Sequence, residues 1–330
     1  MSEPSSSLPA VPSASTLAPP EPPKPATTIF RGPEGIRAGW RILICIAMSG
    51  GLLFLIGAIA GIILRGRHVQ FSGLTPVGTT IQEGILFLVA AIPAVIMTRI
   101  ERRTWNEYGL PLRHAFGRDF WIGGLIGFAS ISACLCAIYL FHGFRLTGLA
   151  IHGPTIPAAT LAWVLAFIVV GLAEEFSFRG YIQYTLTQGI GFWPAAIILS
   201  VLFGLAHGAN PGESKAGLAS VVCFALLFCL FLRRTGNLWL PVGFHFGWDW
   251  GQTFVYGVPD SGLLPYHNLF NCAFSGPTWL TGGTVGPEAS VFTPIVLGIV
   301  AILFASVYRE KQYRVLSPAL TLPSSATTSI

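Results

Sequence analysis

Apolar runs of membrane-spanning length recur along this 330-residue chain. They cover residues 41–64, 80–97, 120–141, 157–187, 192–208, 216–232, 238–256 and 291–308. A helix needs about 20 apolar residues to cross the hydrocarbon core of a bilayer. Only 10% of the residues are charged and the mean hydropathy is +0.66, whereas soluble domains carry about 25% charged residues. The sequence therefore predicts an all-α, polytopic membrane protein with about eight transmembrane helices.

Two polar tails flank this apolar region. Residues 1–36 are rich in Pro, Ser and Ala, cannot bury a core and are predicted to be disordered. They contain no signal-peptide core, so we expect the first span to act as the membrane anchor. The predicted divisions are the tail 1–36, N-terminal spans and a basic loop in 37–156, a core in 157–257, an outer loop and last span in 258–310, and a tail in 311–330.

Basic residues predict the orientation of the chain. With eight spans and the N-terminus inside, 15 of the 19 Lys and Arg residues fall on the side of the termini, and the other four are Arg65, Arg67, Arg145 and Lys215. Cytoplasmic loops carry the excess of Lys and Arg. We therefore expect both termini to be cytoplasmic, in the plasma membrane if the source is bacterial.

Several classes of site find no support in the sequence. The six cysteines include no C-x-x-C pair, and no nucleotide-binding loop or nucleic-acid module is present. The lipid bilayer is the expected partner, without nucleic acid. Two glycine pairs, Gly57/Gly61 and Gly123/Gly127, allow helices to approach closely, and we expect them to pack within the bundle.

The segment 171–179 (GLAEEFSFR) places charges inside the fourth apolar run. Such residues are costly at bilayer depth and usually line a functional cavity. Glu174 and Glu175 point about 100° apart around a helix, whereas Glu175 and Arg179 are neighbours one turn apart. We therefore expect Glu175 to pair with Arg179 and Glu174 to face elsewhere.

Two later runs each bring a histidine. His207 follows Phe203 by four residues at the end of the fifth run, and His245 precedes Asp249 by four residues in the seventh. The spacing lets Glu174 and His207 lie level, and lets His245 bond to Asp249. Glu174 with His207 would deprotonate a water, and His245 with Asp249 would stabilise the oxyanion of a hydrolytic reaction.

Each motif taken alone also fits a structural role, as a helix-packing ion pair, an interfacial histidine or a satisfied polar pair. Their order, Glu-Glu-x-x-x-Arg, Phe-x-x-x-His and His-x-x-x-Asp, resembles the CPBP (CAAX protease and bacteriocin-processing) family over about residues 163–257. This family includes the type II prenyl-CAAX endopeptidases. The resemblance implies an intramembrane endopeptidase with a catalytic cavity, acting on a protein or peptide substrate that can be lipid-modified.

By the same resemblance, Glu174 is the catalytic glutamate, His207 shares the water, and His245 with Asp249 stabilises the oxyanion. The resemblance gives Glu175, Arg179 and Phe203 supporting positions. Members of the family were long described as metalloproteases and later as metal-free glutamate proteases; we expect no cofactor here, with zinc as the alternative.

Many family members have Asn where this chain has Asp249, and an ionised Asp would repel an oxyanion. One alternative is therefore a zinc protease with Glu174, His207, His245 and Asp249 as ligands, although no His-Glu-x-x-His motif supports it. A non-enzymatic scaffold or transporter is the other alternative.

Overall fold

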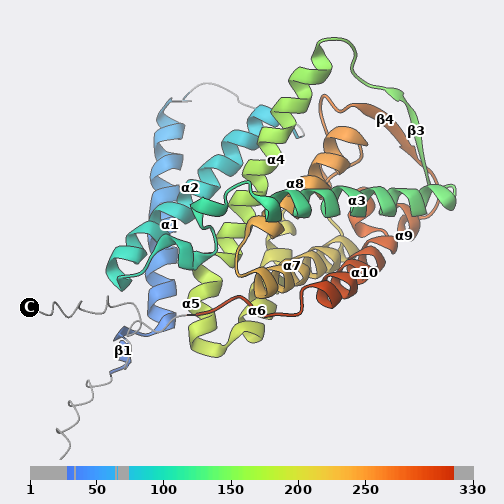
Figure 1. The fold of residues 1–330 in the computed structure, drawn as a ribbon. Coiled ribbons are helices and arrows are strands. Elements are labelled where there is room, and N and C mark those ends of the chain that lie inside the picture. Colours follow the sequence, from blue (N-terminus) through green and yellow to red (C-terminus); the bar gives the residue numbers. More distant parts are fainter. Residues whose placement is uncertain (1–27, 33–34, 64, 66–73, 316–330) are drawn as a thin grey trace, which may run out of the picture.

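Helices make up most of the described structure (Figure 1), which is a computed structural model covering residues 28–32, 35–63, 65 and 74–315. The principal helices are α1 (Ala38–Ile63), α2 (Pro76–Glu101), α3 (Arg118–Leu140), α4 (Thr155–Arg179), α5 (Tyr181–Ile190), α6 (Phe192–His207), α7 (Lys215–Thr235), α8 (Trp239–Asp249) and α10 (Phe292–Val307). Shorter turns are η1 (Trp105–Tyr108), η2 (Leu112–His114), η3 (Trp250–Val255), α9 (Thr278–Thr281) and η4 (Pro287–Ala289). The strands are β1 (Arg31–Gly32), β2 (Gly35–Ile36), β3 (Phe144–Leu149) and β4 (Phe270–Phe274).

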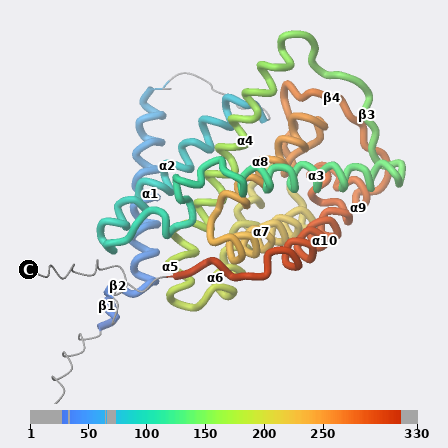
Figure 2. The backbone as a smooth tube through the Cα atoms, viewed as in Figure 1, coloured from blue at the N-terminus to red at the C-terminus, as the bar shows by residue number. Residues whose placement is uncertain are grey.

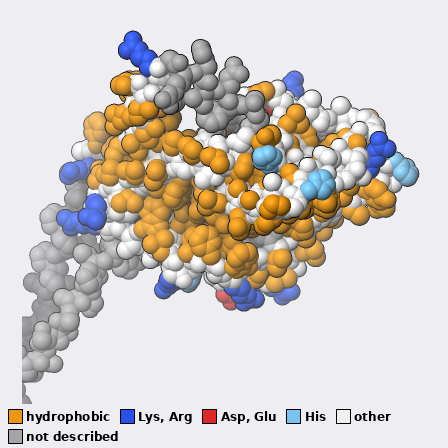
Figure 3. Space-filling view, turned by 90° about the horizontal axis from the view of Figure 1, so that it is seen from above, with side chains coloured by type: hydrophobic (Ala, Val, Ile, Leu, Met, Phe, Trp, Pro, Cys, Tyr) orange, Lys and Arg blue, Asp and Glu red, His pale blue; other side chains and the backbone are white. Residues whose placement is uncertain are grey.

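The predicted all-α polytopic membrane fold is confirmed. Five helical stretches are long and apolar enough to cross a bilayer: α1, α2, α3, the continuous stretch of α4 and α5, and α7. The helices α6 and α10 are apolar but shorter. Hydrophobic side chains cover much of the face seen in Figure 3, with Lys and Arg at its margins. The count of eight spans stays a prediction.

The fourth span differs from the single helix predicted for 157–187. It is interrupted at Gly180, where α4 ends and α5 begins. A Cβ atom at Gly180 would lie 2.5 Å from the Phe176 carbonyl oxygen, so this break requires glycine. Arg179 thereby becomes the last residue of α4, where a cation is favoured by the helix dipole.

Glycines bring α8 against both α3 and α4. A Cβ at Gly127 would lie 2.1 Å from the carbonyl oxygen of Phe244, and one at Gly247 would lie 2.0 Å from that of Gly124. On the other side, a Cβ at Gly171 of α4 would lie 2.9 Å from the Val242 carbonyl oxygen. Helix backbones approach this closely only where side chains are absent. The expected packing role of the Gly123/Gly127 pair is therefore confirmed.

The other glycine pair behaves differently. No atom of the described residues lies within 4 Å of a Cβ built at Gly57 or Gly61, so the expectation that this pair packs inside the bundle is wrong. Helix α1 stands at one edge of the bundle, against α2 and α5 (Figure 1). Most of its side chains are exposed, as they would be against lipid tails, which explains why the pair meets no helix.

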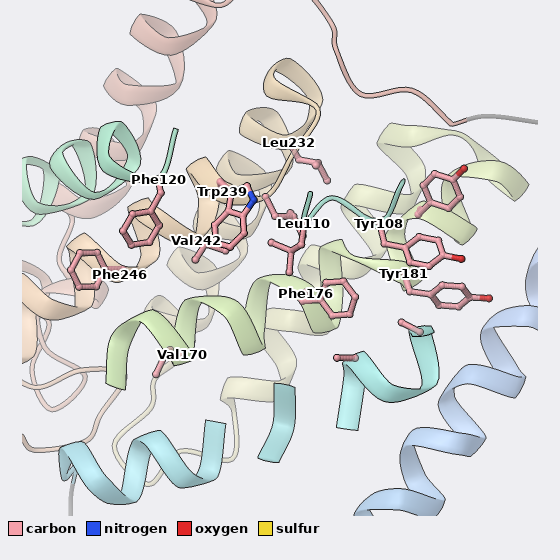
Figure 4. Close-up of a cluster of buried hydrophobic side chains, with 14 of the residues drawn as sticks. Tyr108, Leu110, Phe120, Val170, Phe176, Tyr181, Leu232, Trp239, Val242 and Phe246 are labelled. Carbon is pink, nitrogen blue, oxygen red and sulfur yellow. The ribbon is translucent and has the colours of Figure 1, made fainter. Parts of the chain in front are cut away.

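The loop between α2 and α3 is part of the core. In this loop Tyr108 and Leu110 are buried against α4, α5 and α8 (Figure 4). Trp105 stacks on Phe176 with ring centroids 4.6 Å apart. Glu101 joins this region to α1 and α5 through an ion pair with Arg41 and a hydrogen bond from Tyr181.

Two strand pairs were not predicted. Strand β3 pairs antiparallel with β4 beyond the end of α3, and β1 pairs with β2 before α1. The second pair lies at the end of the predicted disordered tail, whose residues 1–27 are outside the described residues. After α10 the chain returns toward α6 and α7 (Figure 2), where Tyr313 donates its backbone N–H to the Arg233 carbonyl. Residues 316–330 of the predicted C-terminal tail are also outside the described residues.

Candidate active site

A cavity of about 610 Å³ lies among the helices and the loops after η3. Its walls come from α2, α4, α6, α7 and α8, and one end is lined by residues of the segment 260–288. The lining is a mixture of aromatic side chains and carboxyl or imidazole groups. Its ionisable members among the described residues are Glu83, Glu174, His207, His245, Asp249, Asp260 and Glu288.

Helix α4 separates its two adjacent glutamates as expected. The Glu174 side chain lines the cavity and is 24% exposed, whereas Glu175 is completely buried. An oxygen of Glu175 lies 3.4 Å from Nη1 of Arg179, one helical turn on. The predicted pair is therefore present, and it leaves Glu174 without that cation.

Arg179 is held among aromatic rings as well as by Glu175. Its guanidinium carbon lies 4.3 Å from the centre of the Phe203 ring and 5.9 Å from that of Phe228. A desolvated cation over an aromatic face gains about 2 kcal/mol. Phe203 thus links α6 to the charged end of α4.

His207 is fixed by its own helix. Its Nδ1 lies 2.9 Å from the carbonyl oxygen of Phe203, and since a carbonyl can only accept, Nδ1 carries the proton. Nε2 then faces the cavity, 3.9 Å from Oε2 of Glu174. The Phe203 ring packs edge-on against the imidazole, with centroids 4.6 Å apart.

His245 lies between three carboxyl groups. Its Nδ1 donates to Glu175 at 3.1 Å, and its Nε2 is 3.6 Å from Glu174 and 3.3 Å from Asp249. Two carboxyl groups beside Nε2 favour a second proton on the ring. The contact with Glu175 was not anticipated, because it depends on how α4 and α8 face each other.

Asp249 is the last residue of α8, where the α-helix gives way to a π-helical turn. The chain continues as the π-helical turn η3 instead of the single helix predicted for 238–256. A wider turn of this kind inside a helix is frequent at functional sites. It leaves the Asp249 side chain, which is 8% exposed, beside both His245 and the carboxyl groups of the following loop.

The side chains best placed to hold a metal ion are not the four considered from sequence. Ligand atoms of Asp249, Asp260 and Glu288 all lie within 4.8 Å of one another. Among the described residues, this is the cluster of at least three His, Cys, Asp or Glu side chains that is compact enough to hold a metal ion. The set is all oxygen, which suits a hard cation more than zinc. Only Asp249 belongs to the zinc set considered from sequence.

Three ionisable residues that line the cavity were not predicted from the sequence to belong to the site. Glu83 of α2 lies inside the second apolar run, and a carboxyl group at that depth is itself a signal of function. Asp260 and Glu288 come from a loop without Lys or Arg. Burial raises the pKa of Glu288 to about 8, with repulsion from Asp260 adding to the effect, and burial raises that of Asp260 to about 6.

The fold defines an integral membrane protein whose helices enclose a cavity lined by carboxyl and imidazole groups. Residues 156–251 match the model of the family described as type II CAAX prenyl endopeptidase Rce1-like. This match confirms the resemblance of the chain to the CPBP/CAAX proteases and supports a general function as a CAAX-type membrane protease. A comparison with curated proteins found no match.

Proposed function

We propose that this protein is an intramembrane endopeptidase that hydrolyses a peptide bond with a water activated by Glu174 and His207. The observation that carries the proposal is the position of the Glu174 carboxylate, which points into the cavity and faces both histidines at 3.9 and 3.6 Å. Those separations are too long for direct hydrogen bonds, so the Glu174 carboxylate is free to bind a water in the cavity.

In the proposed reaction Glu174 is the general base. It takes a proton from the water as the water oxygen bonds to the carbonyl carbon of the scissile peptide. His207, whose Nε2 is unprotonated in the neutral tautomer fixed by Phe203, accepts the second hydrogen bond of that water. The protonated Glu174 then gives its proton to the amide nitrogen as the C–N bond breaks, which releases an amine and a carboxylic acid.

His245 is the proposed donor to the oxyanion. With Nδ1–H bound to Glu175, a proton on Nε2 is directed toward the space shared with Glu174 and Asp249. A hydrogen bond placed where charge develops is worth about 3–4 kcal/mol of transition-state stabilisation. Asp249 would favour the cationic ring, so an aspartate can stand where many relatives have asparagine.

The surroundings of the site support a substrate that approaches through the bilayer. A second, largely apolar cavity of about 320 Å³ lies between α1, α2 and α4, and shares Leu86, Ser177 and Phe178 with the main cavity. We propose that it receives an apolar part of a membrane-associated protein or peptide, such as a lipid modification. The named family acts on CAAX prenyl substrates, and this chain would use the same kind of chemistry.

We further propose that both termini face the cytoplasm. The support is the distribution of basic residues, because only Arg65, Arg67, Arg145 and Lys215 would lie on the opposite side. The cavity end lined by Asp260 and Glu288 would then face outward.

The test is Glu174→Gln, which keeps the shape of the side chain but removes the base. Purified wild type and variant are reconstituted in vesicles with membrane proteins of the host, and cleaved products are identified by mass spectrometry. We expect products from wild type and from the control Glu310→Gln, whose side chain is exposed and outside the cavity, but none from Glu174→Gln. Equal cleavage by Glu174→Gln would refute the catalytic assignment. Melting temperatures verify that each variant is folded.

Zinc chemistry at Glu174, His207, His245 and Asp249 remains the rival mechanism, and a non-enzymatic scaffold is the rival function. Metal analysis of active wild-type protein tests the zinc mechanism. If the protein contains stoichiometric zinc and its removal abolishes cleavage, the metal-free mechanism is wrong. A scaffold would show no cleavage in any preparation.

A further inference from the structure

The cavity is strongly acidic. Five carboxyl side chains line it, those of Glu83, Glu174, Asp249, Asp260 and Glu288, and its described lining contains neither Lys nor Arg. The two histidines, and the proton that Glu288 keeps because burial raises its pKa to about 8, offset part of this charge but not all of it. Because charges in a cavity of low dielectric interact strongly, such a lining favours a cationic occupant over a neutral or anionic one.

Four of these carboxyl groups have partners within the described part of the protein. Glu174 and Asp249 lie within ion-pair distance of Nε2 of His245, at 3.6 and 3.3 Å, although Oε2 of Glu174 accepts no hydrogen bond from described residues. Asp260 accepts a hydrogen bond from Thr253 at 2.6 Å, and Glu288 accepts from the backbone and hydroxyl of Ser261 at 2.9 Å. Their positions are explained by the local structure.

Glu83 is different. It is only 7% exposed, yet the only hydrogen bond it receives from described residues comes from the amide of Gln82 to Oε1, at 3.2 Å. Its Oε2 is buried and without a partner, and no described Lys, Arg or His lies within 4.0 Å of the carboxylate. Leaving a carboxylate buried and unpaired costs several kcal/mol. A group retained at that cost inside a cavity is a candidate for binding a ligand of opposite charge.

Glu83 also lies at the right place for a substrate contact. It lines from α2 the same cavity that His207 of α6 and His245 of α8 line, and it is near enough to Glu174 and His245 to interact with them electrostatically. Neighbours on the same face of α2, including Thr79 and Leu86, line the cavity above and below it.

We propose that Glu83 binds a cationic group of the substrate, a lysine or arginine side chain close to the scissile bond, and so determines specificity. The proposal rests on the proteolytic function proposed above, and deepens it by naming a substrate class: apolar segments that contain a basic residue. The competing explanation is a permanently protonated Glu83, which would hydrogen-bond a neutral group.

The experiment uses a set of apolar peptides in which a single lysine, or its uncharged isostere norleucine, is moved along the sequence. Wild type, Glu83→Gln, Glu83→Asp and the control Glu310→Gln are purified in lipid nanodiscs. Two quantities are compared for each lysine/norleucine pair: the ratio of kcat/KM, and the ratio of binding constants on the Glu174→Gln background, read by fluorescence anisotropy.

We expect wild type and Glu310→Gln to prefer lysine at one position by tenfold or more. Glu83→Gln should bring both ratios near one, while Glu83→Asp keeps a reduced preference because it keeps the charge. Ratios in Glu83→Gln equal to those of wild type would overturn the proposal, as would a wild type without any preference. If no peptide is cleaved by any preparation, the proteolytic function fails, and the binding ratios still decide whether Glu83 recognises a cation.

Discussion

Replacing Glu175 by glutamine tests whether the buried ion pair organises the site. One oxygen of Glu175 serves both Arg179, at 3.4 Å, and His245, at 3.1 Å, and neither Glu175 nor Arg179 is exposed. Glutamine keeps an acceptor oxygen in place but removes the charge. Arg179 would then be a buried cation without a counter-charge.

The size of the effect follows from that loss. Breaking a buried ion pair by removing one partner costs about 3–5 kcal/mol. Because the glutamine oxygen can still accept and Phe203 still covers the guanidinium, we expect the lower end, about 3 kcal/mol. At roughly 2 °C per kcal/mol for a chain of this size, the melting temperature should fall by about 6 °C.

The assay is a double-mutant cycle with Arg179→Met. Melting temperatures and turnover are measured for Glu175→Gln, Arg179→Met and the double variant in the same lipid. The double variant removes both charges and should be more stable than Glu175→Gln alone, with a coupling of at least 1 kcal/mol. Additive losses would refute the idea that the pair acts as a unit. Turnover of Glu175→Gln should fall but remain measurable, since the proposed base is Glu174.

Three further predictions follow from the geometry. Asp249→Asn should keep most of the activity if His245 donates to the oxyanion, whereas a zinc enzyme would lose both metal and activity, as measured by turnover and metal content. Gly127→Ala should lower stability by about 1–3 kcal/mol or more, because its Cβ would lie 2.1 Å from the Phe244 carbonyl; Gly57→Ala, with no atom within 4 Å, is the matched control in a melting experiment. Glu288 keeps its proton in the folded protein up to about pH 8, whereas the unfolded chain loses it near pH 4.5. Stability should therefore decrease between these pH values, and Glu288→Gln should flatten the decrease in melting temperature.

The bounds of several helices were predictable because length and apolarity are local properties. The run 192–208 corresponds to α6, and 216–232 to α7, within three residues at each end. The break at Gly180 was missed because a glycine inside an apolar run is compatible with an uninterrupted helix. Only the folded geometry reveals that a side chain at Gly180 would collide with the Phe176 carbonyl oxygen, so that glycine is needed where α4 ends.

The site was predictable to the extent that it depends on spacing within one helix. The spacing of four residues indicated both the Glu175–Arg179 pair and the His245–Asp249 pair. Contacts between helices were not accessible, because the rotation of each helix about its axis is set by packing. The bond from His245 to Glu175 depends on Gly171, which lets α4 approach α8. Glu83 was visible in the sequence, but nothing there indicated that α2 faces the same cavity.

The neighbourhood of Asp249 bears on how an aspartate can lie beside the oxyanion of the proposed reaction. Its carboxyl group lies within 4.8 Å of those of Asp260 and Glu288, and three carboxylates this close cannot all be ionised at low cost. The raised pKa of Glu288 is consistent with at least one proton held by the trio near neutral pH. The negative charge around Asp249 is then smaller than three ionised carboxylates would give, which is compatible with the donor role proposed for His245 at the oxyanion.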